Sequence, residues 1–164
     1  MGYLSGTHNR KAFDCGTPAL NRYLAEQASQ DMRRRVASCF VATVAAAGAD
    51  SSSPAVAGFY TLASASVPLT LLPDDVARKL PRYAAIPTVR MGRLAVDLHF
   101  KGQGLGAALL ADALARASRS EVAAFALLVD AKDATAKRFY QHHGFIAFES
   151  AEQSLFLPLA TVPG

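Results

Sequence analysis

Three alternating glycines, placed between an apolar run and a helical pattern, constrain this chain more than any other feature. The segment reads "TVRMGRLAVDLHFKGQGLGAALLADALARA", residues 88–117, and contains Gly102, Gly104 and Gly106. Glycine has no Cβ, so a loop rich in it can turn its N–H groups inward. A helix that begins there adds unpaired N–H groups and the positive end of its dipole. The segment therefore predicts a cradle for a diphosphate.

Two common phosphate-binding motifs do not fit this segment. A P-loop ends in Gly-Lys-Ser or Gly-Lys-Thr, whereas these residues read "GLGAAL". A dinucleotide-binding fingerprint needs Gly-x-Gly-x-x-Gly inside the first parallel β-α-β unit. Here the third glycine comes one position early, and the preceding strand follows an expected antiparallel hairpin. Another kind of coenzyme site is therefore indicated.

The remaining pattern predicts a mixed α/β fold in one domain, residues 1–164, a length that suits a single hydrophobic core. The passage through residues 89–131 reads as a right-handed parallel β-α-β unit in a mostly antiparallel sheet. The hairpin before it has a turn at 48–54. Thr17 is expected to cap the first helix, with Pro18 at its first position. Helices are expected over 17–35, within 71–82, and over 104–119 and 133–144; strands are expected over 36–46, 55–67, 86–96, 123–131, 145–150 and 154–159.

Composition excludes several classes of protein. No window resembles a membrane-spanning helix, and residues 1–16 lack the apolar stretch of a signal peptide, so a cytoplasmic protein without a membrane partner is expected. Cys15 and Cys39 lack a metal-binding spacing and are expected to be small buried residues. The four histidines are not spaced for metal binding either, so no metal is expected.

Positive charge is concentrated in two segments of a chain whose formal net charge is +4. Arg33, Arg34 and Arg35 form one of them. The other runs from Arg78 to Lys101, where Asp97 is the only acid. Such segments are typical of a surface that binds a phosphate backbone, although a solvated face is the alternative reading.

At this point the residues carry a family resemblance. Residues 89–110, "VRMGRLAVDLHFKGQGLGAALL", resemble the acetyl-CoA segment of the GCN5-related N-acetyltransferases (GNAT), whose signature is Arg/Gln-x-x-Gly-x-Gly/Ala. Lys101 occupies the first slot in place of Arg or Gln. The resemblance implies that acetyl-CoA is the cofactor and that the strand residues Leu94, Ala95 and Val96 hold its pantetheine arm and acetyl carbonyl. It also implies a diphosphate site at Lys101, Gly102, Gln103, Gly104, Leu105, Gly106 and Ala107.

A second segment, "DATAKRFYQHHGF" at 133–145, resembles the closing part of the same family. There a helix delivers a tyrosine near the coenzyme sulfur, which makes Tyr140 the candidate general acid. The alternative is an aromatic side chain that only packs beside Phe139. The resemblance also implies coenzyme contacts for Phe139 and for Asp133, which stands where many members have Asn.

The N-terminal half resembles the acetyltransferase toxins of bacterial toxin–antitoxin pairs. The match runs through His8, Arg10, Phe13, Cys15, Gly16, Leu20, Tyr23 and Leu24. This branch implies aminoacyl-tRNA as the acceptor, arrest of translation, and a small ribbon-helix-helix antitoxin as partner. Candidate tRNA-binding residues are Arg33, Arg34, Arg35, Arg90 and Arg93. A homodimer through the β-rich C-terminal part is compatible with the sequence.

Two other functions stay open at this stage. The same fold could acetylate a protein or a small-molecule amine, although basic clusters disfavour a polycationic acceptor. Alternatively, the chain could bind acetyl-CoA or RNA without catalysis. No general base is obvious: His99 could be proposed, but it also fits an exposed loop histidine, and the ester-activated amine of aminoacyl-tRNA could lose its proton to water.

Overall fold

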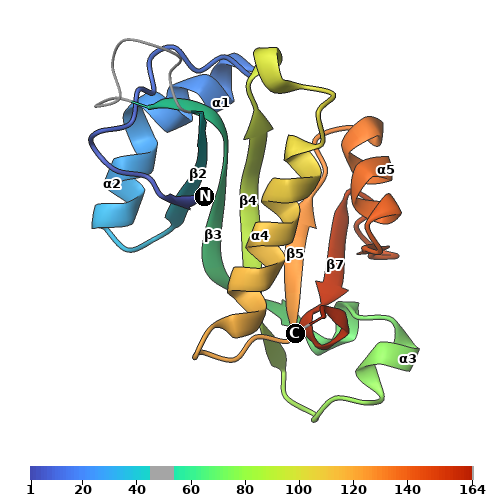
Figure 1. The fold of residues 1–164 in the computed structure, drawn as a ribbon. Coiled ribbons are helices and arrows are strands. Elements are labelled where there is room, and N and C mark those ends of the chain that lie inside the picture. The colour runs from blue at the N-terminus through green and yellow to red at the C-terminus, as the bar shows by residue number, and fades with distance from the viewer. Residues whose placement is uncertain (45–53, 164) are drawn as a thin grey trace. The chain divides into compact units, whose positions relative to one another are not determined.

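The computed structural model describes residues 1–44 and 54–163, which form two compact units. Unit 1 comprises Met1–Ala63 and Gly92–Ala113, and unit 2 comprises Ser64–Met91 and Leu114–Gly164. Among the described residues, the strands, whose bounds are given below, pair in the order β1-β2-β3-β4-β5-β7-β6. Figure 1 labels β2, β3, β4, β5 and β7. The predicted α/β class with a mostly antiparallel sheet is confirmed. The single acetyltransferase domain over residues 1–164 stays a prediction.

The strands of unit 1 begin with the hairpin expected from the sequence. Strand β2 (Ser38–Val44) pairs antiparallel with β3 (Ala55–Pro68), from Ser38 opposite Leu62 to Val44 opposite Ala55. The expected turn at 48–54 lies almost entirely outside the described residues. The short β1 (Gly2–Tyr3), which the sequence did not predict, pairs with β2. Cys15 and Cys39 are buried free thiols, as expected.

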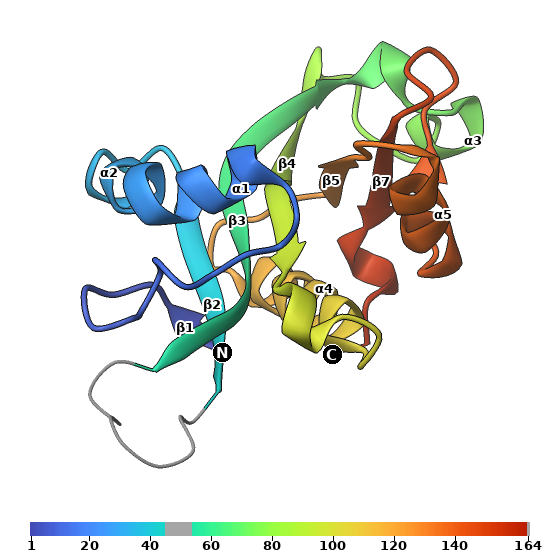
Figure 2. The ribbon, with the colours of Figure 1, turned by 90° about the horizontal axis from the view of Figure 1, so that it is seen from above.

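The first helical region of unit 1 is not the single α-helix predicted over 17–35. It consists of α1 (Pro18–Arg22), a π-helical turn η1 (Tyr23–Gln27) and α2 (Ala28–Arg33), which follow one another in Figure 2. The wider turn arises where the Ala28 N–H donates to the Tyr23 carbonyl, five residues back. Thr17 is the N-cap residue and Pro18 begins the helix, as predicted, but the Thr17 side chain makes no capping hydrogen bond.

One face of this helical region joins the core of unit 1. Tyr23, Leu24 and Ala28 are buried and pack in one cluster with strand residues that include Phe59 and Ala95. The Tyr23 and Phe59 rings stack with centroids 6.2 Å apart. Burial of these apolar side chains stabilises the helix against the hairpin. The helix therefore presents its polar residues, including the arginines that follow Met32, to solvent.

Unit 2 contains the predicted parallel pairing. Strand β4 (Ala85–Val96) pairs parallel with β5 (Ala126–Asp130), from Thr88 opposite Ala126 to Met91 opposite Val129. On its other side β5 pairs antiparallel with β7 (Ser154–Pro158), which also pairs with β6 (Ile146–Ala147). Strand β5 is therefore paired along both edges, and its residues Ala126–Val129 are all buried. Burial of consecutive residues explains why the sequence of β5 is continuously apolar and does not alternate with polar residues.

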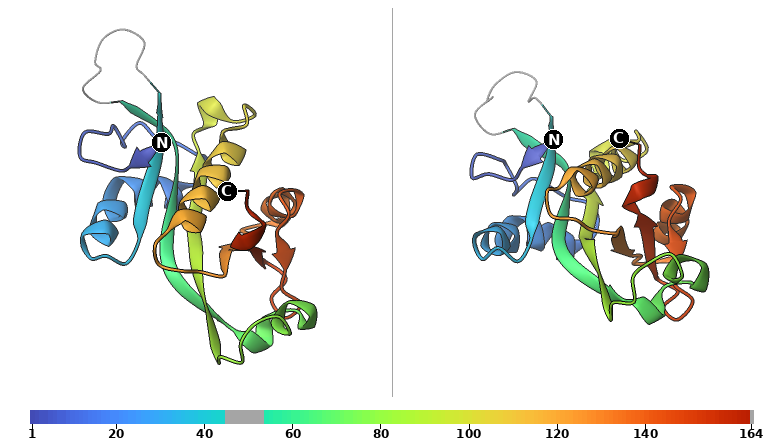
Figure 3. Two further views of the ribbon diagram at one scale, coloured as in Figure 1. Left: turned by 60° about the horizontal axis from the view of Figure 1, so that its bottom comes forward. Right: turned by 90° about the horizontal axis from the view of Figure 1, so that it is seen from below.

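The helices of unit 2 lie in its connections and at its C-terminal side. Figure 3 shows the green connection between β3 and β4, which holds the short turn η2 (Leu69–Leu71) and α3 (Asp74–Ala77). Helix α5 (Ala134–His142) runs beside β7 in Figures 1 and 2, and the turn η4 (Leu159–Thr161) follows β7. The long helix α4 (Leu105–Arg119), preceded by the turn η3 (Leu98–Phe100), contributes residues to both units. None of the described helices is long and apolar enough to cross a membrane.

Candidate active site

The predicted diphosphate cradle is a loop followed by the start of α4, and we call residues 101–107 the phosphate loop. Gly102 and Gly104 have φ angles of +78° and +81°, which side chains rarely tolerate. A Cβ at either position would meet no atom within 4 Å, so the backbone conformation alone explains these two glycines. Gly106 lies inside α4, which begins at Leu105, and needs no such conformation.

The first helical hydrogen bond of α4 shows which N–H groups are available. The Ala108 N–H donates to the Gly104 carbonyl at 3.1 Å. The N–H groups of Leu105, Gly106 and Ala107 therefore precede the first intrahelical donor and have no acceptor within the helix. No atom lies within 4 Å of where a Cβ on Gly102 or Gly104 would be, so the space beside these two residues is open. The free N–H groups and this open space suit the oxygens of a diphosphate. The glycine turn and the helix start are therefore as predicted, and diphosphate binding at this loop stays a prediction.

The end of β4 leads into this loop through Asp97 and the turn η3. Leu94 and Val96 are half-buried and Ala95 is buried. A side chain on Gly58 of β3 would place its Cβ 3.0 Å from the Ala95 carbonyl oxygen and 2.8 Å from the Leu109 side chain. Gly58 is therefore required for the close approach of β3 to the end of β4 and to α4 within unit 1. Sequence reasoning had not singled it out.

Asp97, immediately after β4, is the centre of a polar network that sequence reasoning missed. Its carboxylate is buried and accepts hydrogen bonds from the N–H of Asp14 at 3.0 Å and the N–H of His99 at 2.9 Å. The Nδ1 atom of His99 lies 2.8 Å from the same carboxylate. Burial opposes ionisation, but these contacts outweigh it and hold the pKa of Asp97 below its usual value.

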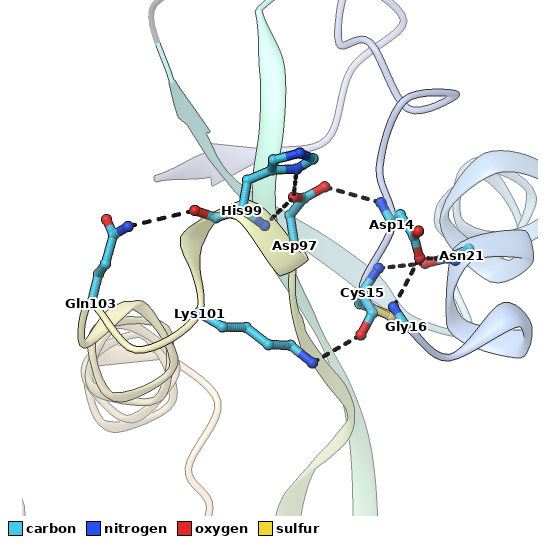
Figure 4. A network of polar contacts seen from close by, with 8 residues as sticks. All are labelled: Asp14, Cys15, Gly16, Asn21, Asp97, His99, Lys101 and Gln103. Atoms are coloured by element: carbon cyan, nitrogen blue, oxygen red, sulfur yellow. Dashed lines mark hydrogen bonds and ion pairs between the residues drawn. The ribbon is translucent and has the colours of Figure 1, made fainter.

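The partner of Asp97 is a short stretch that we call the N-terminal segment, Asp14–Gly16 (Figure 4). The Leu98 N–H donates to the Asp14 carbonyl at 2.8 Å, which complements the Asp14-to-Asp97 bond. The Asp14 carboxylate accepts from the Gly16 N–H at 2.9 Å and from Asn21 Nδ2 at 3.0 Å, and these bonds lower its pKa. The segment is therefore fixed both to its own helix and to the residues before the phosphate loop.

The Lys101 side chain points to the N-terminal segment: its Nζ donates to the Cys15 carbonyl at 3.0 Å. The place of Lys101 in the diphosphate site stays a prediction. Gln103, by contrast, makes only a long contact of 3.5 Å to the His99 carbonyl. His99 is the exposed histidine expected, although its ring is held by Asp97.

Tyr140, the candidate general acid, lies in α5 of unit 2 and is buried. Its ring packs against Phe139 and Phe145, with centroids 5.3 and 5.5 Å away. Burial, with a smaller contribution from the Asp130 carboxylate, raises the pKa of Tyr140 to about 12. Gly144 closes the helix with a φ of +92°, as the sequence predicted. The tyrosine is thus a neutral phenol at physiological pH.

Asp133 and Phe139 occupy the same helix. The Asp133 carboxylate caps α5 by accepting the Ala136 N–H at 2.8 Å. Asp133 therefore acts as the N-cap of α5, a role that Asp and Asn fill about equally well. Phe139 is half-buried and also packs against His143 at 4.8 Å. Their predicted contacts with the coenzyme stay predictions.

The five candidate tRNA-binding arginines have different surroundings. Arg33, Arg34 and Arg35 are exposed at the end of α2 in unit 1. Arg93 of unit 1 lies over the Tyr23 ring, with Cζ 3.6 Å from the centroid. Arg90 of unit 2 forms an ion pair with Asp130, which also accepts the Ser154 hydroxyl. Arg93 and Arg90 therefore each contact a side chain of their own unit, Tyr23 and Asp130 respectively.

Tyr23 connects Arg93 to the helical region. Its hydroxyl donates to Asp31 at 2.8 Å, and Gln27 Nε2 donates to the other oxygen of that carboxylate at 2.9 Å. The hydrogen bond from Gln27 and the smaller contribution of the one from Tyr23 lower the pKa of Asp31, although burial acts in the opposite direction. The π-helical turn thus supplies both donors. Within residues 1–44 and 54–163, no cluster of His, Cys, Asp or Glu could hold a metal ion.

Comparisons with known proteins identify relatives of this chain. The family described as acetyltransferase (GNAT) domain matches residues 82–156. A tRNA-acetylating toxin from Mycobacterium tuberculosis (strain ATCC 25618 / H37Rv) is 33% identical over 144 residues, which cover 87% of this chain and 81% of that protein.

Two solved structures are also similar over nearly the whole chain. AtaT complexed with acetyl-methionyl-tRNAfMet has a TM-score of 0.86 at 30% identity, covering 96% of this chain and 92% of that one. A mutant AtaT toxin bound to the C-terminus of the antitoxin AtaR and acetyl-CoA has a TM-score of 0.80 at 27% identity, covering 98% and 92%.

Proposed function

Because this chain belongs to the GNAT acetyltransferases and is related along most of its length to a tRNA-acetylating toxin, we propose that it is an acetyl-CoA-dependent toxin that acetylates aminoacyl-tRNA. The acceptor is the α-amino group of the amino acid on the tRNA. Acetylation converts that amine to an amide, which cannot attack the next peptidyl ester, so translation stops. The observation that carries the proposal is the similarity to the mycobacterial toxin, which extends through both units.

The phosphate loop supports acetyl-CoA as the cofactor. When bound, acetyl-CoA supplies an acetyl group activated as a thioester. The residues of this chain hold its diphosphate through the N–H groups of Leu105, Gly106 and Ala107 and through the open backbone at Gly102 and Gly104. The strand residues Leu94, Ala95 and Val96 offer backbone groups to the pantetheine arm. These groups are fixed before the ligand arrives, which reduces the entropic cost of binding.

Tyr140 supplies the proton that the reaction needs. When acetyl-CoA is bound, the Tyr140 phenol would donate its proton to the leaving thiolate as the C–S bond breaks. The proton that the attacking nitrogen loses as the amide forms would return to the phenolate, so that Tyr140 is regenerated. Its pKa of about 12 keeps the phenol protonated at neutral pH. The ester of aminoacyl-tRNA makes the amine less basic than a lysine amine, so the amine can become neutral by losing its proton to water. A strong base from the protein is then unnecessary.

The acceptor contributes a polyanionic backbone, which the arginines bind. Arg33, Arg34 and Arg35 form an exposed basic group, and Arg93 is held in place by the Tyr23 ring. The Arg90 side chain is half exposed even though it pairs with Asp130. An exposed ion pair contributes little to stability, so a phosphate of the tRNA can replace Asp130 as the partner of Arg90. We further propose a cytoplasmic location and a small ribbon-helix-helix antitoxin as partner, since a related toxin binds an antitoxin.

The decisive experiment incubates the purified protein with labelled acetyl-CoA and total charged tRNA. Mass spectrometry of the released aminoacyl-adenosines then identifies any N-acetylated amino acid. A product confined to one or a few amino acids supports the proposal and identifies the specificity. If the protein acetylates only lysine-containing proteins or small amines, the chain is an acetyltransferase with another acceptor and the toxin proposal is wrong.

A further inference from the structure

The residues before the phosphate loop are held at two points by the N-terminal segment. At the first point, Asp97 accepts the Asp14 N–H at 3.0 Å and Leu98 donates to the Asp14 carbonyl at 2.8 Å. At the second point, Lys101 Nζ donates to the Cys15 carbonyl at 3.0 Å. The turn η3 and the first residue of the phosphate loop are therefore fixed at both ends by residues that are more than 80 positions away in the sequence.

The Asp97 carboxylate, which makes the first of these contacts, is buried, and burial of a charged group is energetically unfavourable. Only about 5% of Asp97 is exposed, and burying an ionised group without compensation is strongly unfavourable. Three contacts compensate it, and two of them come from backbone N–H groups, which have fixed directions. An apolar residue could fill the same space but could not orient those N–H groups. The arrangement therefore specifies a backbone conformation in addition to packing the core.

The N-terminal segment is itself held by hydrogen bonds, so it can act as a support. Asn21 of α1 contacts it twice: Asn21 Oδ1 accepts the Cys15 N–H at 2.9 Å, and Asn21 Nδ2 donates to the Asp14 carboxylate at 3.0 Å. Gly16 has a φ of +86°, and a Cβ there would lie 3.3 Å from the Leu98 side chain. The Cys15-Gly16 pair thus fits tightly against the turn that precedes the phosphate loop.

We infer that the N-terminal segment holds the phosphate loop in its binding conformation through Asp97 and Lys101, and that these are positioning residues for acetyl-CoA. The inference rests on the proposed function, because it takes the phosphate loop as the diphosphate site. It gives Lys101 a role other than the direct phosphate contact that its place in the signature suggests. Asp97 acts through the Asp14 and His99 N–H groups and does not itself contact the coenzyme.

The first test replaces Asp97 and measures acetyl-CoA affinity by isothermal titration calorimetry. Asp97→Asn keeps the size but puts an N–H₂ group against N–H donors, so the loop loses part of its support. We expect the Kd for acetyl-CoA to rise at least tenfold. Asp31→Asn is the control, because Asp31 is another hydrogen-bonded carboxylate of unit 1, but its two donors are the side chains of Tyr23 and Gln27 and it makes no bond to the N-terminal segment or to residues 97–101. It should lower the melting temperature comparably and leave the Kd within about twofold.

The outcomes separate the inference from the proposed function. Failure of the wild-type protein to bind acetyl-CoA overturns the proposed function, and the inference with it. If the wild-type protein binds and Asp97→Asn binds equally well, only the inference is overturned. A Kd that rises equally in both variants is also contrary to it, because general destabilisation would then explain the effect.

Lys101→Met provides a second test at an exposed residue, where folding is not at risk. Removing the bond to the Cys15 carbonyl should raise the Kd several-fold without changing how the affinity depends on salt concentration. A charge that contacts phosphate directly is screened by salt, so its removal would flatten that dependence. A flattened salt dependence, or an unchanged Kd, would therefore overturn the positioning role of Lys101.

Discussion

The phosphate loop of unit 1 and the tyrosine of unit 2 are built in opposite ways. The loop is exposed, is shaped by two glycines with positive φ, and is supported by a network of hydrogen bonds that involves two carboxylates. Tyr140 is buried among aromatic rings, and the main influence on its hydroxyl is the loss of water. Binding a diphosphate requires fixed N–H groups, whereas keeping a proton requires apolar surroundings. Changes in the two regions should therefore affect different kinetic constants.

The largest expected effect is on Tyr140. Tyr140→Phe keeps the ring packing against Phe139 and Phe145 and removes only the proton donor. General acid catalysis typically contributes a factor of about 10² to 10⁴, so kcat should fall at least about 10²-fold. The Kd for acetyl-CoA should stay within about twofold. Single-turnover kinetics and calorimetry measure the two quantities separately.

A Tyr140→Phe variant with normal kcat would assign the tyrosine to packing alone. His142→Phe is a suitable control, because it changes another ring on α5 whose residue is exposed. That variant should keep both constants.

The basic group at the end of α2 should affect the acceptor and not the coenzyme. Changing Arg33, Arg34 and Arg35 together to Gln removes three exposed charges. We expect the KM for charged tRNA to rise roughly tenfold or more and its salt dependence to weaken, because fewer counterions are released on binding. The Kd for acetyl-CoA should not change. Equal KM values for the variant and the wild type across salt concentrations would remove these arginines from the tRNA site.

Within the phosphate loop, the two kinds of glycine should respond differently. Gly104→Ala puts a Cβ on a residue with a φ of +81°, which costs about 1–2 kcal/mol of strain or forces the loop to change shape. We expect roughly a tenfold loss of acetyl-CoA affinity. Gly106→Ala lies within α4, where alanine is the better helix former, and should keep the affinity within about twofold. Equal losses in both variants would show that backbone conformation is not what the loop requires.

Sequence reasoning succeeded where a structure is encoded locally. The glycine turn and the closure of α5 at Gly144 follow from neighbouring residues, and the parallel pairing of β4 with β5 follows from the strand-helix-strand order of one continuous stretch. It failed for contacts between distant residues. The bond between Asp14 and Asp97 joins positions 83 residues apart, and the position of Arg93 over Tyr23 depends on a fold that brings β4 beneath the π-helical turn. The only local signal for Asp97 was an acid directly after an apolar strand.

The smallest expected effect is on the pH dependence of stability, and it distinguishes the two regions again. The pKa of Asp97 is lowered in the folded protein, so its stabilising contribution is complete above the unfolded value of about 4 and is lost as the pH falls through the folded value. The melting temperature of the wild type should therefore fall as the pH drops below about 4, and less steeply in Asp97→Asn. Tyr140 has a raised pKa, so its neutral form dominates throughout that range, and Tyr140→Phe should show the same acid dependence as the wild type.

Thermal melts at constant ionic strength measure how steeply the melting temperature of each variant changes with pH. If Asp97→Asn keeps the slope of the wild type, the contacts of Asp97 do not stabilise its charged form, and the phosphate loop would depend on backbone conformation alone.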